Sequence, residues 1–319
     1  MAKKKMPRTP RKTTTSVTIE QTATRAHKKF MRTSRPLSGK VIGISISRPD
    51  DIEQYGYSDW DVNRITVRLS ESLLNAGAHL VFGHDWRPDG IMTAICGLAV
   101  KSHSVDDSES PPLIQNYLAH PDTTSLPDEQ KQDLAQRDLV QIRNILPPTL
   151  SGATDSELDR ALALSRMRFK MNEAIDARIC VGGKRPQPDG KDGPSGFFAG
   201  VAEEAYWAAK TGKPLLVADF LGGVTAELIR TLNPKSKKQS NEAEERISFK
   251  ILKDKEKLYR QASASLKSNE LSEFNLPPKD LKKVFNINKL NAATDGLWTQ
   301  GCEAVDVDSF SAVVRQLKL

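Results

Sequence analysis

Short apolar runs alternate with longer segments in which apolar residues recur every three or four positions. The runs span 40–46, 79–82, 178–181 and 215–218, and each suits a strand that is buried on both faces. The periodic segments predict helices over about 61–76, 91–101, 155–174, 200–211 and 225–232. Strands that alternate with helices in this way predict an α/β fold, with a mainly parallel sheet and helices on both of its faces.

The remaining segments give weaker patterns. Residues 113–118 suit a strand or a helix, and residues 119–155 give no clear strand. Residues 233–290 are rich in Lys, Glu, Ser and Asn, which predicts a charged helical or partly disordered insertion. A short strand at 304–307 and a closing helix at 308–317 follow it. The predicted organisation is a basic flexible tail over 1–38, an α/β domain over 39–232 plus 291–319, and the insertion over 233–290.

Charge is distributed unevenly along the 319 residues. The formal net charge is +7, yet residues 1–40 contain 12 Lys or Arg against one acid, Glu20, so the rest of the chain is slightly acidic. A basic tail rich in Ser, Thr and Pro is typical of disorder, and it also suits contact with the phosphates of a nucleic acid.

Other classes of protein are disfavoured by the sequence. No apolar stretch is long enough to span a membrane and no secretory signal is evident, so we expect a cytoplasmic protein without a membrane partner. The three cysteines, Cys96, Cys180 and Cys302, are scattered and lack metal-ligand spacing. They predict buried thiols in a reducing compartment and no metal site.

The strongest candidate for chemistry begins where the run 178–181 ends. Gly182 and Gly183 follow this run, so the backbone is able to approach a ligand closely at the carboxyl end of a strand. Lys184 comes next and supplies a cation, and the loop after it is rich in Gly, Pro and Asp. This layout predicts a nucleotide pocket, with the nucleotide as ligand and no other cofactor.

The helix that follows the loop adds two carboxylates. It begins near Gly200, and its N-terminus attracts anions through its free N–H groups and its dipole. Glu203 and Glu204 lie in or near its first turn, where they are able to hold ribose hydroxyls. The alternative is that both carboxylates only stabilise the helix end.

Further polar residues and glycines fall at the other predicted strand ends. Because the carboxyl ends of parallel strands share one edge of the sheet, we expect them to line the same pocket. These candidates are Ser45, Ser47, Asp85, Arg87, Gly222 and Gly223, with Arg168 as a further phosphate contact.

Four motifs resemble the SLOG superfamily, which contains the DprA and "lonely guy" (LOG) domains. They are Gly182-Gly183-Lys184, Ala199-Gly200-Val201-Ala202-Glu203-Glu204-Ala205, Gly212-Lys213-Pro214-Leu215 and Phe220-Leu221-Gly222-Gly223. Residues 73–90 are similar to the branch found in bacterial conflict systems, which is related to the ligand-binding domain of melastatin-type TRP channels. The resemblance covers roughly 40–232 plus 295–319.

This resemblance implies a Rossmann-like sheet and a pocket for a nucleotide or an ADP-ribose derivative. It implies a ligand sensor, in the setting of a bacterial or phage conflict system and antiviral defence. Such a sensor passes the binding event to a partner protein or within a homo-oligomer. The leading hypothesis is therefore a binding module for an ADP-ribose-like, NAD-like or nucleoside-phosphate ligand.

Two alternatives remain. LOG enzymes, which cleave the N-glycosidic bond of nucleoside monophosphates, share a Pro-Gly-Gly-x-Gly-Thr-x-x-Glu motif. Aligned on Gly200 and Glu204, this chain lacks the proline, the early glycines and the threonine, and has Phe197, Phe198 and Val201 in the loop and helix start. An N-glycosidase or phosphoribohydrolase acting on a nucleotide or NAD, with Glu204 as catalytic carboxylate, is the second hypothesis. Nucleic-acid association through the tail is the third.

Overall fold

Six parallel strands form one sheet in the part of the chain that the computed structural model describes, which is residues 35–83, 91–102, 112–120, 139–148, 156–186, 196–232, 247–268 and 274–285. In sheet order the strands are β4 (Val140–Ile145), β3 (Ile114–Ala119), β2 (His79–Phe82), β1 (Val41–Ser47), β5 (Ala177–Gly182) and β6 (Leu215–Ala218). The predicted α/β fold with a Rossmann-like, parallel sheet is confirmed.

Strand β1 lies at the centre of this order. It pairs with β2 on one side and with β5 on the other, where Ser45 is opposite Cys180. The chain order runs outward from β1 through β2 and β3 to β4, and outward in the other direction from β5 to β6. In open α/β sheets, ligands bind where the order reverses, beyond the carboxyl ends of the strands. The boundary between β1 and β5 is this point.

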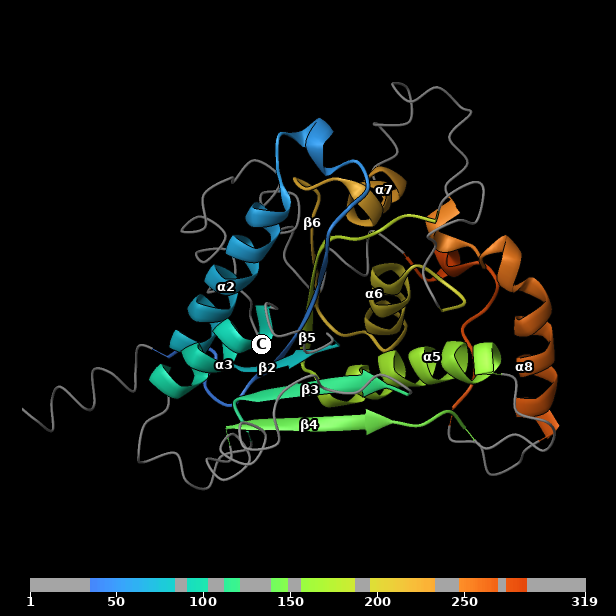
Figure 1. Cartoon of the computed structure of the whole chain (residues 1–319), viewed down its shortest axis with the longest axis horizontal. Coiled ribbons are helices and arrows are strands. Elements are labelled where there is room, and N and C mark those ends of the chain that lie inside the picture. Colours follow the sequence, from blue (N-terminus) through green and yellow to red (C-terminus); the bar gives the residue numbers. More distant parts are fainter. Residues whose placement is uncertain are drawn as a thin grey trace, which may run out of the picture. The chain divides into compact units, whose positions relative to one another are not determined.

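Helices cover both faces of the sheet (Figure 1). On one face lie α2 (Asp59–Asn75) and α3 (Ile91–Ser102), which pack against each other. On the other face lie α5 (Ser156–Ala174) and α6 (Gly200–Lys210), and α7 (Gly223–Leu232) contacts α6. The connections after β1 and β5 thus lead to helices on opposite faces of the sheet (Figure 1).

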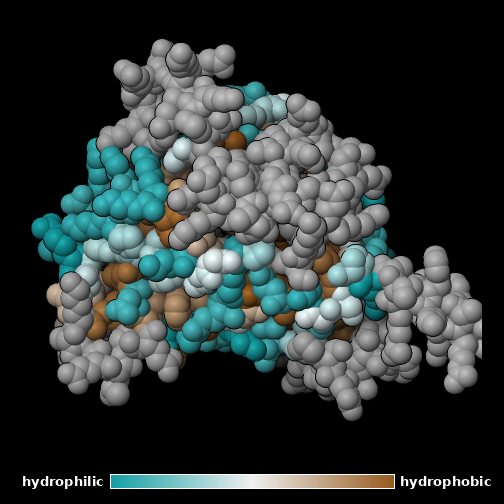
Figure 2. All heavy atoms as spheres, turned by 180° about the vertical axis from the view of Figure 1, so that it is seen from behind, coloured by the Kyte–Doolittle hydropathy of each residue, from teal (hydrophilic) through white to brown (hydrophobic). Residues whose placement is uncertain are grey.

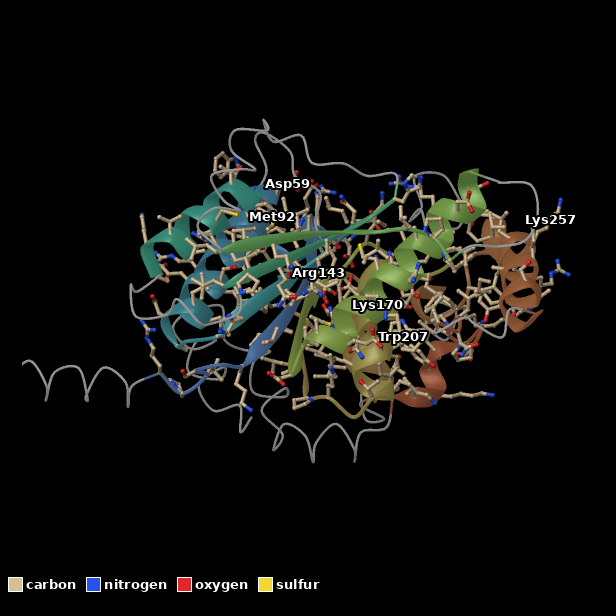
Figure 3. The ribbon with its side chains drawn as sticks, turned by 90° about the horizontal axis from the view of Figure 1, so that it is seen from below. Asp59, Met92, Arg143, Lys170, Trp207 and Lys257 are labelled. Carbon is tan, nitrogen blue, oxygen red and sulfur yellow. The ribbon has the colours of Figure 1, made fainter. Side chains whose placement is uncertain are left out.

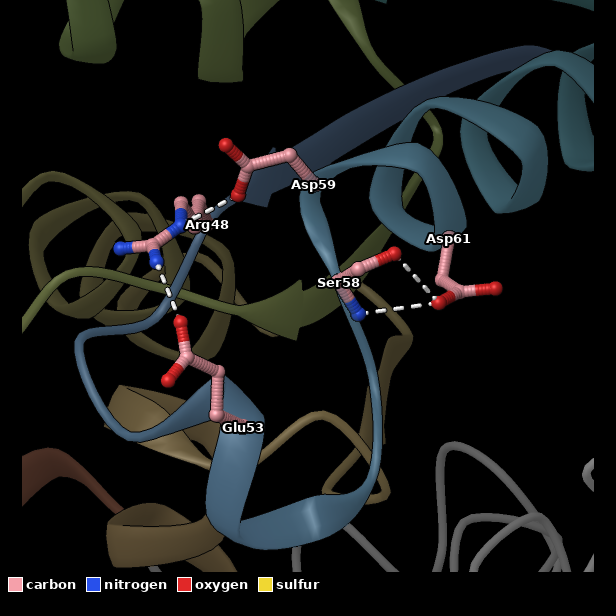
Figure 4. Close-up of polar contacts among 5 residues, drawn as sticks. All are labelled: Arg48, Glu53, Ser58, Asp59 and Asp61. Atoms are coloured by element: carbon pink, nitrogen blue, oxygen red, sulfur yellow. Dashed lines mark hydrogen bonds and ion pairs between the residues drawn. The ribbon is translucent and has the colours of Figure 1, made fainter.

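Local sequence explains where α2 begins and which face it buries. The carboxylate of Asp61 accepts hydrogen bonds from the backbone N–H and the hydroxyl of Ser58, at 2.9 and 2.8 Å (Figure 4). The Asp61 carboxylate thus gives a partner to the backbone N–H of Ser58, a donor at the helix start that has no partner within the helix. Val62, Leu69 and Leu73 lie on the buried face, as their spacing predicts.

The strand β4 was not predicted, and β3 resolves the segment that suited a strand or a helix. All six residues of β3 are buried. In β4, Val140 is buried whereas Gln141, Arg143 and Asn144 are exposed. Strand β4 lies at the edge of the sheet with three exposed polar residues, so its sequence is too polar to give a continuous apolar run.

The segment 247–285 packs into the same core as the sheet domain. It contains the 3-10 turns η4 (Ile247–Phe249), η5 (Lys253–Lys255) and η6 (Leu281–Val284), and helix α8 (Glu256–Ser268), which lies against α5 (Figure 1). Phe249, Tyr259 and Phe274 are buried in the hydrophobic core. The predicted domain boundaries stay predictions, and the elements expected at 304–307 and 308–317 lie outside the described residues.

Aromatic rings join this segment to α5 and α6. The ring of Phe274 lies 5.6 Å from that of Phe169 on α5 and 6.4 Å from that of Trp207 on α6, and Figure 3 shows Trp207 between these helices. Such contacts add to the free energy gained by burial alone.

Both hydrophilic and hydrophobic residues reach the described surface (Figure 2). On the face in Figure 2, hydrophilic residues surround smaller hydrophobic areas. Exposed large hydrophobic side chains come from separate segments: Tyr55, Trp60, Val100 and Leu146. None of the helices in the described ranges is long and apolar enough to cross a membrane.

Candidate functional site

The carboxyl ends of β1, β5 and β6 converge through backbone contacts. The N–H of Gly183 donates to the carbonyl of Ser47 at 3.0 Å, and the carbonyl of Gly183 accepts from the N–H of Val224 at 3.0 Å. The N–H of Gly182 donates to the hydroxyl of Thr225 at 2.9 Å. The structure therefore brings the two glycine-marked turns together, with Ser47 beside them.

Four glycines at this point have positive φ angles: Gly182, Gly183, Gly222 and Gly223. A Cβ on Gly223 would lie 2.3 Å from the carbonyl oxygen of Gly183, and one on Gly222 would lie 2.5 Å from the ring of Tyr55. The loops thus pack directly on each other where only glycine fits.

An acidic residue that the sequence did not single out, Asp51, lies at the N-terminus of α7. Its buried carboxylate accepts a hydrogen bond from the N–H of Gly223 at 2.9 Å and pairs with the guanidinium of Arg185 at 3.0 Å. The N–H of Arg185 donates to Asp50 at 3.1 Å. A carboxylate of the protein thus occupies the anion-binding end of α7.

The connection between β1 and α2 is braced by a second arginine, Arg48. Its guanidinium donates to Asp59 at the start of α2 and lies 3.6 Å from the carboxylate of Glu53 in η1 (Ile52–Tyr55), as Figure 4 shows. All three side chains are substantially exposed, so these pairs contribute little to stability. They limit the positions that the connection adopts beside the strand ends.

Glu204 on α6 joins Ser45 of β1 and Arg178 of β5 in a buried network. The Ser45 hydroxyl donates to Oε2 of Glu204. Nη1 of Arg178 lies 2.7 Å from the same oxygen and 2.7 Å from the Ser45 hydroxyl, which accepts from it. Arg178 is fully buried, whereas the Glu204 side chain keeps 12% of its surface exposed. Oε1 of Glu204 accepts no hydrogen bond from any described residue.

The neighbouring carboxylate, Glu203, pairs with Arg168 of α5. Nη1 of Arg168 lies 2.5 Å from Oε2 of Glu203, and both side chains are buried. A Cβ on Gly196 would lie 2.8 Å from Nη1 of Arg168, and one on Gly200 would lie 3.2 Å from Nη2. The guanidinium therefore lies directly beneath the start of α6, and its Nε is buried without a hydrogen-bond partner.

The two phenylalanines of the loop fill core space. Phe197 and Phe198 are fully buried, and their rings meet the ring of Tyr259 edge-on at 5.6 and 6.1 Å. The carbonyl of Phe197 accepts from the N–H of Leu252 at 3.0 Å. The segment 247–285 thus supports the loop that leads into α6, a contact that no sequence pattern indicated.

Of the remaining predicted residues, Lys184 and Gly200 belong to the described part of the chain and two others do not. Lys184 is half-buried directly after Gly183, at the end of β5, and Gly200 is the first residue of α6. No side chain caps α6, because Ala199 occupies the capping position. Asp85 and Arg87 lie outside the described residues.

Thiol and metal chemistry find no support in the described ranges. Burial raises the pKa of the Cys180 thiol, which lies beside the Ser45 and Glu204 network, to about 12. The thiol is therefore protonated at neutral pH and inert as a nucleophile. No group of three or more His, Cys, Asp or Glu side chains there has an arrangement that holds a metal ion.

Two comparisons with known proteins bear on this site. A family model described as SLOG cluster2 matches residues 36–292, a span that includes all six strands and the segment 247–285. The match confirms the resemblance that the glycine and carboxylate motifs indicated. No curated protein matches the sequence significantly.

Proposed function

We propose that this chain, which belongs to the SLOG cluster2 family, binds a nucleotide-derived ligand where β1, β5 and the start of α6 meet. The ligand class is an ADP-ribose-like or NAD-like molecule, or a nucleoside phosphate. The observation that carries the proposal is the carboxylate of Glu204, which is fixed through one oxygen beside β1 and β5 and whose other oxygen accepts no hydrogen bond from the described part of the chain.

The phosphate group has a position of matching charge. The N-terminus of α6 has no side-chain cap, and Arg168 lies beneath it with an unpartnered Nε. Lys184 at the end of β5 adds a second cation on the solvent side. An anion at this helix end gains from the dipole, the free N–H groups and the Lys184 ammonium, and the Nε–H of Arg168 offers a further donor.

The ribose has an acceptor in Glu204. Its free oxygen, Oε1, is suited to accept hydrogen bonds from ribose hydroxyls, which are donors. Glu203 is the further carboxylate proposed for the ribose, and it would contact a ligand only after exchange of its pairing with Arg168. Ser47, Gly182, Gly183, Gly222, Gly223, Asp85 and Arg87 are proposed to complete the wall of the site.

Titration calorimetry of the full chain with AMP, ADP-ribose, NAD and adenosine tests the proposal. We expect Lys184→Ala to weaken AMP binding about tenfold because a charge-assisted hydrogen bond is lost, and to leave adenosine unaffected. Lys210→Ala, at the opposite end of α6, is the matched control and should bind AMP like the wild type. The proposal fails if no nucleotide of this panel binds, or if Lys184→Ala and Glu204→Gln both bind as the wild type does.

Hydrolysis of the N-glycosidic bond is the second candidate function, and the fixed carboxylate of Glu204 favours it. Such a carboxylate stabilises an oxocarbenium-like centre at the sugar. The same panel, followed by chromatography of released base, separates the two functions. Steady base release that Glu204→Gln abolishes would establish an enzyme, whereas binding without release supports a sensor. The conflict-system role stays a prediction from the family resemblance.

A further inference from the structure

Arg178 is a fully buried cation within a strand whose neighbours in sequence are apolar. It lies between Ala177 and Ile179 in β5 and has no exposed surface. Its Nε and Nη2 atoms are buried without a hydrogen-bond partner. Buried donors without partners and buried ion pairs often lower stability relative to an apolar residue of similar size. Stability alone therefore gives no reason for an arginine at this position.

The surrounding residues are nevertheless shaped to hold this guanidinium. Gly43 lies opposite Arg178 in the adjacent strand β1, and a Cβ on Gly43 would lie 3.0 Å from the side chain of Ile175 and 3.3 Å from Cζ of the arginine. A glycine inside a strand weakens that strand. Its use there often indicates that another group approaches the backbone closely. Gly43 thus leaves room for the guanidinium of Arg178 as well as for Ile175.

The hydrogen bonds that Glu204 accepts in this network both end on one of its oxygens. Nη1 of Arg178 and the Ser45 hydroxyl both donate to Oε2, and Arg178 also donates to the Ser45 hydroxyl. This triangle fixes the plane of the carboxylate and determines which oxygen faces inward. Oε1 is left to accept from other molecules.

From this asymmetry we infer that Arg178, together with Ser45, is a positioning residue that holds Oε1 of Glu204 toward the ribose of the ligand. The inference rests on the function proposed above, because it assigns a task to residues behind the carboxylate of that site. Arg178 itself touches no ligand. Its effect is on the ability of the site to distinguish a sugar with hydroxyls from one without them.

The test compares AMP with 2′,3′-dideoxyadenosine 5′-monophosphate, which lacks both ribose hydroxyls. The ratio of their dissociation constants, measured by titration calorimetry on the full chain, isolates the contribution of the hydroxyls. The variants are Ser45→Ala and Arg178→Met, each of which removes a donor to Oε2. Ser70→Ala is the matched control, because Ser70 is also a fully buried serine whose hydroxyl donates one hydrogen bond, in α2.

We expect the wild type to prefer AMP by about tenfold or more, the effect of a hydrogen bond to a charged group. Ser45→Ala and Arg178→Met should bring the ratio close to one, while Ser70→Ala keeps the ratio of the wild type. A purely structural role would weaken both ligands equally and leave the ratio unchanged.

Failure of the inference and failure of the proposed function give different results. If the wild type prefers AMP and every folded variant at Ser45 or Arg178 retains that preference, the positioning role is overturned and the site stands. If the wild type binds AMP without a preference, Glu204 does not contact the ribose and the positioning role is overturned, whereas a wild type that binds neither ligand overturns the proposed function itself. Ser45→Ala keeps the ion pair intact, so the test remains decisive if Arg178→Met does not fold.

Discussion

Arg168 on α5 and Glu203 on α6 form an ion pair in the interior of the protein, with 2.5 Å between Nη1 and Oε2. Substituting either residue leaves the other charge buried without its partner. We therefore expect Arg168→Met and Glu203→Gln each to lower the free energy of unfolding by about 3–5 kcal/mol, measured by urea denaturation. The loss of unfolding free energy in the double variant should be smaller than the sum of the losses in the two single variants.

A second pair on α5 provides the control for this prediction. Lys170 and Glu173 lie 2.8 Å apart and are partly exposed. Lys170→Met should cost about 0.5 kcal/mol or less, as is usual for exposed pairs on a helix. Equal losses for Lys170→Met and Arg168→Met would show that burial of the Arg168 pair does not govern its energy.

Because the turns after β5 and β6 are in contact, alanine substitutions at two glycines should destabilise the protein by different amounts. Gly212 and Gly223 have similar φ angles of 70° and 64°. Nothing lies within 4 Å of a Cβ placed on Gly212, so Gly212→Ala should cost only the backbone strain of about 1–2 kcal/mol. Gly223→Ala should cost substantially more, because its Cβ would lie 2.3 Å from a backbone oxygen. Similar losses in chemical denaturation would contradict the packing described for this turn.

Glu227 on α7 predicts a pH dependence of stability. Burial raises the pKa of this carboxyl above its ordinary value of 4.5, against the opposing effects of Ser248 and of the cations Arg185, Arg230 and Lys282. The folded protein thus retains a proton that the unfolded chain releases, so this group contributes stability at low pH that is lost as pH rises through the folded pKa.

Glu227→Gln removes this dependence. From about pH 4 to about pH 8, the free energy of unfolding of the variant should rise relative to that of the wild type and then level off above the folded pKa of Glu227. Thermal or urea unfolding at each pH measures the difference. A difference that stays constant across this range would show that Glu227 has the same pKa in both states.

Four strands were predictable from sequence because their residues are buried almost throughout. β1, β2, β5 and β6 give short apolar runs bounded by turn residues, and their observed bounds differ little from the predicted ones. β4 was missed because its exposed Arg143 and Asn144 resemble a loop, whereas β6, at the other edge of the sheet, is buried throughout. A strand with exposed polar residues lacks the continuous apolar signal on which the prediction depends.

The site was predictable only where the motif is local. The glycines after β5 and the carboxylates of α6 are close in sequence, whereas Asp51 meets Gly223 across 172 residues. Arg178 did leave a signal, a charge inside an apolar run, but its partners Ser45 and Glu204 become apparent only when β1, β5 and α6 are assembled. Long-range pairing of this kind has no periodicity to detect.

The central place of β1 has a consequence for synthesis on the ribosome. Ser45 and Arg178 are 133 residues apart in sequence. The edge of β1 that pairs with β5 therefore has no partner strand while that length of chain is translated. At typical elongation rates the delay is on the order of ten seconds, during which an apolar strand edge is open to wrong pairing. Chaperones that bind nascent chains would therefore have their main task at the early strand, and slower translation before β5 would lower the yield of native protein.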